Sequence, residues 1–246
     1  GFAYEMFLDE KGEKISKSKG NGITIEEWLK YASPESLSLY MYQNPQRAKK
    51  LYHEVVPKAV DEYLDCIEKY ETQESLKKIS NPVWHVHNGI PPSEKMIMSF
   101  SMLLNLVGTS NASSKELLWK FVKKYKKNIK EKENPIFDQL INYAIKYFND
   151  VVKLNKKFKK PNQEEKLALN NLAEKLRGCN ESMSPEAIQT IVYSAGKENG
   201  YKENLRDWFK MIYEVIFGDE NGPRLGFFIS FFGVKETIDL IKNKIK

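Results

Sequence analysis

The sequence predicts a mainly α-helical protein. Beyond residue 44, apolar residues recur at helical spacing over most of the chain. Helix starts are well marked, because a serine, threonine or asparagine repeatedly stands before a proline or three positions ahead of a glutamate. A strand signal is confined to Phe2–Leu8. Together these observations favour a short strand and a loop, followed by helical domains.

The composition is that of a folded protein that does not enter a membrane. The 246 residues are 41% hydrophobic and 29% charged, and no apolar run is long enough to cross a bilayer. The amino terminus has neither the basic start nor the apolar stretch of a signal peptide and lacks an initiator methionine, so we expect a cut end. Only Cys66 and Cys179 are present, and a chain of this size needs no disulfide. We therefore expect a cytoplasmic protein.

The first elements are a strand, a loop and two capped helices. After the strand Phe2–Leu8, residues 14–22 contain two glycines and one apolar residue, which predicts a mobile loop. Thr24 with Glu27 forms a capping box for a helix that runs through Trp28 and Tyr31. Ser33-Pro34 begins the next helix.

The central part of the chain is predicted to contain two longer helices around a loop. A helical pattern begins at Asn44-Pro45 and continues to Ile67, with a kink expected at Pro57. Residues 81–92 contain three prolines and a glycine, which predicts an ordered loop. Ser93 is then expected to cap a helix that ends at Val107. The remaining helix starts are signalled by Ser113 with Glu116, Pro135, Pro161 before Gln163, Ser184-Pro185 and Pro223.

The loop at residues 14–22 suits a triphosphate. Lysine ammonium groups neutralise phosphate oxygens, hydroxyls and loop amides donate to them, and glycine allows the backbone to approach closely. A lysine that engages mainly as charge moves onto a leaving pyrophosphate lowers the barrier and not only the binding constant. The loop is not an ordinary P-loop, because the sequence contains no G-x-x-x-x-G-K-[ST].

Lys14-Ile15-Ser16-Lys17-Ser18 resembles the KMSKS signature of class I aminoacyl-tRNA synthetases, with isoleucine in place of methionine, and the following Lys19-Gly20-Asn21 also fits. In that family the loop closes on ATP and stabilises the transition state for adenylate formation. The resemblance implies that Lys14, Ser16, Lys17 and Ser18 bind ATP and that Lys14 and Lys17 act in catalysis. Lys17 is the strongest candidate.

Further segments resemble the class I lysyl-tRNA synthetase specifically. They are Glu27-Trp28-Leu29, Pro34–Leu37, Pro57–Tyr63, Asn81–His85, Leu103–Leu106, Asp207-Trp208-Phe209 and Gly222–Gly226. The resemblance implies lysine, ATP with Mg²⁺, and lysine tRNA as ligands of the full-length enzyme, with no cofactor held tightly by this chain and no metal site in it. It also implies three parts: the end of the catalytic domain with the loop at residues 1–44, a helical connecting domain at residues 45–110, and an all-helical anticodon-binding cage at residues 111–246.

The sequence lacks the second signature of class I synthetases. The HIGH motif places two histidines three positions apart against the ATP phosphates, whereas the only histidines here are His53, His85 and His87. We therefore expect the nucleotide-binding half to lie upstream and this chain alone to be inactive.

Two features are candidates for contact with tRNA. Residues 115–132 hold eight lysines against two glutamates, including Lys123 and Lys124, which fits either a phosphate-binding stripe or a solvated helix face. The carboxy-terminal region is rich in aromatic residues, most of which we expect in the core. There, Pro223-Arg224 places an arginine at a helix start, in a region that lies near the third anticodon base in the similar glutamyl enzymes.

Two other interpretations are open at this stage. One is a free-standing helical RNA-binding protein in which the lysine- and serine-rich loop is incidental, and the other is a lysine-rich scaffold that binds only proteins. His85 and His87 with Cys66 or Cys179 match no common zinc spacing, so structural roles are favoured for them.

Overall fold

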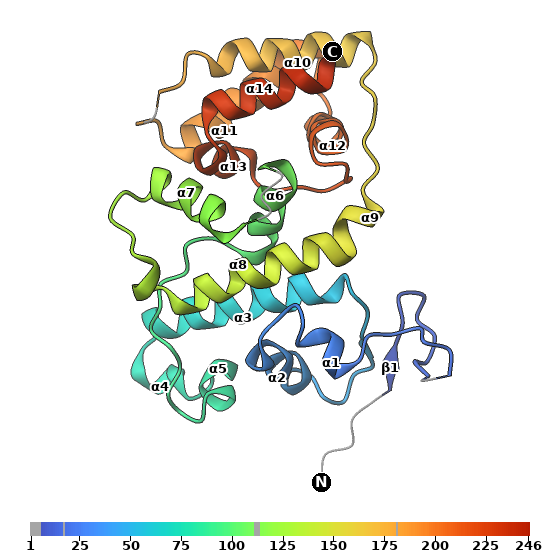
Figure 1. Ribbon diagram of the computed structural model, residues 1–246, viewed down its shortest axis with the longest axis vertical. Helices are drawn as coiled ribbons and strands as arrows, with labels where there is room; N and C mark the ends of the chain where they lie inside the picture. The colour runs from blue at the N-terminus through green and yellow to red at the C-terminus, as the bar shows by residue number, and fades with distance from the viewer. Residues whose placement is uncertain (1–5, 17, 111–113, 181) are drawn as a thin grey trace. The chain divides into compact units, whose positions relative to one another are not determined.

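The computed structural model describes residues 6–16, 18–110, 114–180 and 182–246, and confirms a mainly helical fold (Figure 1). The chain forms two compact units. Unit 1 consists of Gly1–Leu103 with Glu131–Tyr147, and unit 2 of Leu104–Lys130 with Phe148–Lys246. The chain therefore passes between the units three times. This division is by compactness and does not test the three functional parts predicted from the sequence.

The strands form a minimal parallel pair in unit 1. β1 (Phe7–Leu8) pairs with β2 (Lys49–Lys50), with Phe7 opposite Lys49. The predicted strand is confirmed at Phe7–Leu8, and its earlier residues 2–5 lie outside the described residues. The prediction of a helix from Asn44 was wrong, because the backbone at residues 49–51 bonds to Met6 and Leu8 instead. Lys49 also donates its ammonium to the Tyr40 and Gln43 carbonyls, which closes the end of the preceding helix.

The first helices begin where the caps predicted. α1 (Ile25–Trp28) has the full Thr24–Glu27 capping box, and Ser33 caps α2 (Pro34–Tyr42). α1 ends at Trp28 and does not reach Tyr31, because the chain turns there before Ser33.

α3 (Val55–Thr72) provides the central helix of unit 1. Its buried face carries Val56, Ala59, Val60, Tyr63, Leu64 and Ile67. Pro57 lies in its first turn, where the missing amide hydrogen has no partner to lose, so the expected kink is absent from this described helix. α4 (Ser75–Lys78) is short. The loop prediction for residues 81–92 was partly wrong, because Asn81 caps α5 (Pro82–Val86) by accepting from the Val83 amide at 3.0 Å.

The helix predicted from Ser93 starts later, at Phe100. At the start of α6 (Phe100–Ser110), the carboxylate of Asp61 on α3 accepts from the Phe100 and Ser101 amides, and the Ser99 hydroxyl accepts from the Met102 amide at 3.1 Å. Residues 87–99 remain irregular, and Glu94 within them accepts from the Ile136 and Phe137 amides at 2.8 Å. Glu94 therefore caps α8 (Pro135–Tyr147), which begins as predicted, after η1 (Glu131–Glu133).

Unit 2 is built around α11. α11 (Pro185–Gly196) packs on α10 (Gln163–Leu176) and α13 (Leu225–Phe232), while α10 also packs on α14 (Val234–Ile245). α7 (Lys115–Tyr125) contacts α13, with a Tyr125–Phe231 ring separation of 3.9 Å. The other elements are α12 (Leu205–Ile216), α9 (Lys153–Asn155) and the π-helical turns η2 (Phe148–Val152) and η3 (Lys197–Tyr201). Ser114 caps α7; the predicted cap at Ser113 lies outside the described residues.

No helix in the described part of the chain is long and apolar enough to cross a bilayer.

Asp61 provides a test of the fold. Replacing Asp61 with alanine should destabilise unit 1 by about 1–2 kcal/mol, because two amides at the start of α6 lose their acceptor. Asp65→Ala is the matched control, since this carboxylate lies one turn further along α3 and is exposed. Denaturant unfolding followed by circular dichroism measures both free energies. Equal stability of the two variants would contradict the capping role.

Candidate functional site

The KMSKS-type loop lies between β1 and α1. Lys14 forms a bridge with Leu8, and its side chain is exposed, as is that of Ser18, while Ser16 is partly buried. The Ile15 amide donates to the Phe7 carbonyl at 3.0 Å and fixes the start of the loop. Lys17, the residue with the strongest predicted role, lies outside the described residues.

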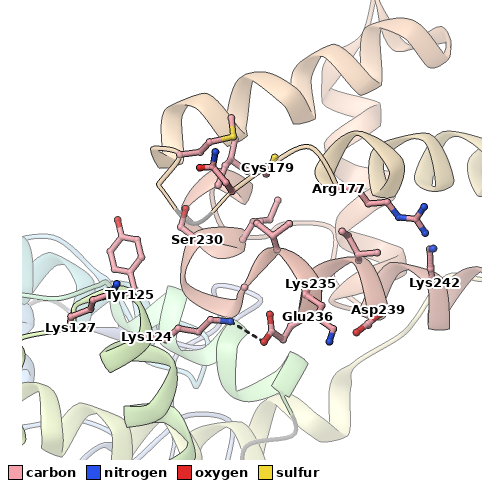
Figure 2. A pocket seen from close by; sticks show the side chains of 17 residues that line it. Lys124, Tyr125, Lys127, Arg177, Cys179, Ser230, Lys235, Glu236, Asp239 and Lys242 are labelled. Carbon is pink, nitrogen blue, oxygen red and sulfur yellow. Dashed lines mark hydrogen bonds and ion pairs between the residues drawn. The ribbon is translucent and has the colours of Figure 1, made fainter.

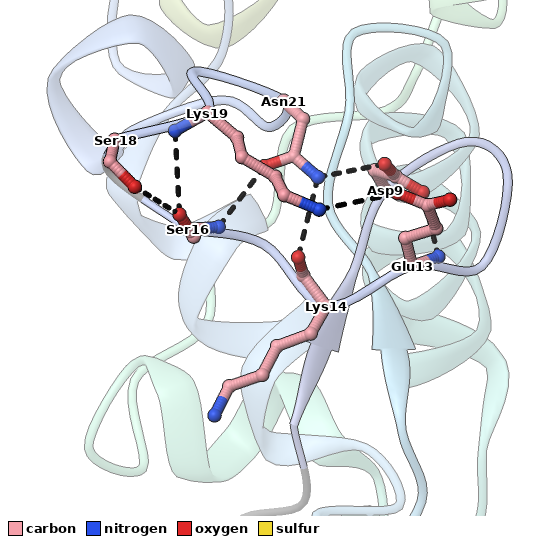
Figure 3. A network of polar contacts seen from close by, with 7 residues as sticks. All are labelled: Asp9, Glu13, Lys14, Ser16, Ser18, Lys19 and Asn21. Atoms are coloured by element: carbon pink, nitrogen blue, oxygen red, sulfur yellow. Dashed lines mark hydrogen bonds and ion pairs between the residues drawn. The ribbon is translucent and has the colours of Figure 1, made fainter.

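A side-chain bridge between Asp9 and Asn21 holds the two ends of the loop together (Figure 3). Asn21 donates to Asp9 Oδ2 at 2.8 Å and to the Lys14 carbonyl at 3.3 Å, and its own Oδ1 accepts from the Ser16 amide at 3.0 Å. Asp9 is buried and also accepts from the Glu13 amide at 2.8 Å. We call this arrangement the Asp9–Asn21 latch. One amide side chain thereby satisfies the backbone on both sides of Ile15.

Inside the latch the backbone makes a tight turn. The Ser16 carbonyl accepts from the Lys19 and Gly20 amides, each at 3.1 Å, and Gly20 adopts a positive φ of 58°. A side chain at that φ would be strained, which explains the glycine. The Ser16 and Ser18 hydroxyl oxygens lie 2.8 Å apart. Two hydroxyls of the signature are therefore next to each other at the turn.

The charges of the loop are divided between two sides. Hydrogen bonds from the Asn21 side chain and from the Glu13 amide hold the pKa of Asp9 below its ordinary value, so Asp9 is a carboxylate at neutral pH. Lys19 Nζ lies 3.6 Å from Glu13 Oε2, so Lys19 is on the side of the loop that carries the carboxylates of Asp9 and Glu13. Figure 3 shows the Lys14 ammonium pointing away from Asp9 and Glu13. The Lys14 ammonium therefore lies apart from these two carboxylates.

Sequence reasoning did not identify Asp9 and Asn21 as a pair. Asn21 stands in the sequence analysis only as part of the segment that follows the signature, and Asp9 was not singled out. A twelve-residue separation in a loop has no periodicity to indicate contact, so the pairing emerges only from the folded backbone.

Arg224 lies on the surface at the start of α13. Its guanidinium carbon is 5.6 Å from the centre of the Phe227 ring, and both side chains are exposed. The residues around it are fixed by packing: the Pro223 carbonyl accepts from the Tyr213 hydroxyl at 3.0 Å, and the Gly226 amide donates to Gln189 Oε1 at 2.7 Å. The motif therefore presents an arginine from a rigid support.

Lys123 and Lys124 lie exposed in the last turn of α7, whose buried residues are Leu118, Trp119 and Val122. Lys124 forms an ion pair with Glu236 at 3.1 Å, so one of the two candidate lysines also connects α7 to α14. α7 and α13 pack together, and the two groups predicted to contact tRNA therefore stand on neighbouring helices of unit 2.

Most carboxy-terminal aromatic residues belong to the core, as predicted. The buried ones are Trp208, Phe217, Phe228, Phe231 and Phe232. Phe227 is 37% exposed, and it is the ring beneath Arg224.

The histidines have protein partners. His87 Nε2 lies 2.9 Å from the Tyr63 hydroxyl, and His85 Nε2 lies 2.9 Å from the Ile79 carbonyl oxygen. Burial lowers the pKa of His87. The described residues contain no group of three or more histidine, cysteine or acidic side chains placed to hold a metal ion.

Comparison with known proteins gives a consistent result over the whole chain. Residues 1–90 match the family described as class I tRNA synthetases (K). Proteins named lysine–tRNA ligase from Rickettsia bellii and Roseobacter denitrificans are each 46% identical to this chain, and one from Rickettsia felis is 45% identical. Each of the three alignments covers 98% of the chain.

The chain belongs to the class I lysyl-tRNA synthetase family. It spans about half the length of its relatives, 47% of the R. bellii protein and 45% of the R. denitrificans protein. The family match at residues 1–90 contains the whole KMSKS-type loop and the latch, while the alignments to the lysyl-tRNA synthetases extend through unit 2.

The latch can be tested with a protease. Asn21→Ala should raise the rate of tryptic cleavage after Lys14, Lys17 and Lys19 about tenfold, because three hydrogen bonds that restrain the loop are lost. Mass spectrometry of early time points measures cleavage at each lysine. Ser18→Ala is the control, since it removes only the contact between the two hydroxyls. If Asn21→Ala is cleaved no faster than the unmodified protein, the latch does not restrain the loop.

Proposed function

We propose that the full-length protein activates lysine with ATP and transfers it to lysine tRNA, and that this chain supplies the KMSKS-type loop and the tRNA-binding region. The observation that carries the proposal is the latched loop at residues 9–21, within a chain that is 46% identical to lysine–tRNA ligases. The loop alone would fit several nucleotide-binding proteins. Its combination with that similarity favours adenylate formation over other phosphate chemistry.

In this proposal the loop grips the ATP phosphates. The Lys14 and Lys17 ammonium groups neutralise charge that develops on the departing pyrophosphate, and the adjacent Ser16 and Ser18 hydroxyls donate to phosphate oxygens. The latch lowers the entropy lost when the loop closes, because its two ends are already joined. Mg²⁺ would accompany ATP, held by the phosphate oxygens, and no carboxylate cluster of this chain is needed for it.

The chain alone should not activate lysine. None of its three histidines stands three positions from another, so the HIGH-type pair that grips the phosphates from the opposite side must come from elsewhere in the full-length enzyme.

We further propose that unit 2 binds tRNA. The lysines of α7 provide phosphate contacts that do not depend on sequence, and Arg224 contacts a base of the anticodon from its place over Phe227. A free-standing RNA-binding protein or a protein-binding scaffold is not favoured, because the similarity to lysine–tRNA ligases extends over 98% of the chain.

The role of Lys17 can be tested in the full-length enzyme. Lys17→Ala should lower the rate of lysyl-adenylate formation by about a hundredfold or more, on the order of 3 kcal/mol, with a much smaller effect on ATP affinity. Pre-steady-state kinetics measures both quantities. Lys11→Ala is the control, because this exposed lysine lies outside the signature. An unchanged rate for Lys17→Ala would remove the loop from the mechanism.

The tRNA contacts can be tested by filter binding of this chain to lysine tRNA and to an anticodon-swapped tRNA at several salt concentrations. Arg224→Ala should lose discrimination between the two by roughly 1–3 kcal/mol. Lys123→Ala with Lys124→Ala should weaken both tRNAs alike and reduce the salt dependence.

Two controls separate binding from folding in that experiment. Lys197→Ala with Lys202→Ala removes the same charge from exposed positions outside α7, so it should retain the discrimination between the two tRNAs and most of the affinity. Gly226→Ala should instead disturb folding, because its side chain would meet the Pro185 carbonyl. If Arg224→Ala leaves the ratio of the two affinities unchanged, its anticodon role is wrong.

A further inference from the structure

Unit 1 contains a cavity that the proposed contacts with ATP and tRNA do not use. It lies between the start of α2, the first half of α3, the 87–99 segment and α8. Its volume of about 430 Å³ falls within the range of about 300–1,000 Å³ that is usual for small-molecule sites. Most of its wall is apolar, with Val60, Ile136 and Leu140 among the lining residues. The cavity therefore has room for one small molecule with an apolar body.

The charge of the lining is negative. Among the described residues that line the cavity, Glu35 is the only carboxylate, and there is no lysine or arginine, although the chain has 39 of them. Glu35 is half-buried, and within the described part of the chain its side chain has no hydrogen-bond or ion-pair partner. A carboxylate at an apolar wall without a counter-ion is a partner for a cation that comes from outside.

His87 adds no positive charge to the cavity at neutral pH. Its Nε2 lies 2.9 Å from the Tyr63 hydroxyl oxygen, and the two rings stack at a centroid distance of 5.9 Å. Burial lowers the pKa of His87 despite the opposing effect of Glu35, so the imidazole is neutral at pH 7. Burial also raises the pKa of Tyr63, whose hydroxyl therefore stays protonated. The pair forms an uncharged aromatic part of the wall.

An anion finds little to bind in this cavity. α8 begins at its edge, and the start of a helix ordinarily attracts anions. Here Glu94 already occupies that position, because its carboxylate accepts from the Ile136 and Phe137 amides at 2.8 Å. At the start of α2, the Ser33 hydroxyl accepts from the Ser36 amide at 3.2 Å. Both helix starts at the cavity thus have acceptors supplied by the protein.

The larger cavity of unit 2 differs in the sign of its charges. Lysines and an arginine line it together with carboxylates, and Figure 2 shows Lys124 joined to Glu236. Arg177 and Lys242, which also line it, are both within ion-pair distance of Glu174. That cavity carries charges of both signs, and most of its cations are paired, whereas the described lining of the unit 1 cavity carries charge of one sign only.

We propose that the cavity of unit 1 binds a small organic amine with an aromatic body, whose ammonium pairs with Glu35 and whose ring lies against the wall that includes Tyr63 and Tyr143. Carboxylates and the faces of aromatic rings both attract an ammonium ion. Lysine itself does not fit this site, because its own carboxylate would be placed beside Glu35 with no cation to balance it. The inference does not rest on the proposed activation of lysine or on tRNA binding.

Three ligands of similar shape test the preference for positive charge. Phenethylamine, phenethyl alcohol and hydrocinnamate are cationic, neutral and anionic at neutral pH. Ligand-observed NMR titration of this chain measures the three dissociation constants, which are expected in the millimolar range for ligands with so few atoms. The amine should bind about tenfold more tightly than the alcohol, and the anion should bind more weakly than the alcohol.

Two variants locate the binding, and a third serves as a matched control. Glu35→Gln should lower the affinity for the amine about tenfold, to that of the alcohol, and leave the alcohol unchanged. Glu68→Gln removes an exposed carboxylate of α3 that does not line the cavity, so it should leave all three constants unchanged. Gln139→Trp places a large ring at an exposed position on the edge of the cavity and should weaken binding of every ligand. Circular dichroism checks that each variant is folded.

Four outcomes would overturn the inference. If the amine and the alcohol bind equally well, Glu35 does not select for charge. If Glu35→Gln or Gln139→Trp binds the amine as tightly as the unmodified chain does, the amine is bound elsewhere. If lysine binds as tightly as phenethylamine, the aromatic body is not recognised. If none of the three ligands binds in the millimolar range, the cavity is not a binding site. The proposed roles of the KMSKS-type loop and of Arg224 stand or fall by their own tests.

Discussion

Unit 1 depends on a simple constraint: the first amides of each helix need acceptors. Two of its helices take them from distant parts of the chain, since Asp61 caps α6 and Glu94 caps α8 across about forty residues. Each carboxylate accepts from two successive amides, which fixes both the start of the helix and its direction. α3 is thereby joined to the start of α6, and the 87–99 segment is joined to the start of α8. The Tyr31 ring, just before α2, meets the Tyr147 ring edge-on, and Tyr147 donates to the carbonyl of His53, just after β2.

The same principle operates in the loop at a smaller scale. A buried carboxylate, Asp9, orients one amide side chain, and Asn21 in turn serves the backbone at Lys14 and Ser16. Of the residues proposed to act on ATP, Lys14 and Ser18 are exposed and Ser16 is partly buried, so the described part of the loop is held mainly by the hydrogen bonds of Asp9 and Asn21.

The sequence predictions were more accurate where the signal came from residues close together in the sequence. Caps within four residues, such as Thr24 with Glu27 and Ser33 at α2, indicated helix starts correctly. The helix assigned from Ser93 began instead at Phe100, where Ser99 accepts from the Met102 amide and the remote Asp61 accepts from the Phe100 and Ser101 amides. The sequence did not predict the pairing of Lys49–Lys50 with β1, because that pairing depends on a strand far away in the sequence. It also did not predict the helix Pro82–Val86, because this helix is a single turn inside a proline-rich segment. The KMSKS-type residues could be proposed from the sequence because their pattern is contiguous, and their roles remain predictions, whereas the Asp9–Asn21 contact and the cavity of unit 1 could not be predicted.

The Gly222–Gly226 segment has a consequence for redesign. A Cβ at Gly222 would lie 2.3 Å from the Tyr213 ring, and one at Gly226 would lie 2.0 Å from the Pro185 carbonyl oxygen. Neither position leaves room for any other residue, whereas Arg224 and Phe227, between and beside them, extend into solvent. Packing therefore prevents substitution of the two glycines, whereas the two surface positions can be substituted. A library that tests the proposed tRNA contact of Arg224 can randomise residues 224 and 227 together and leave both glycines untouched.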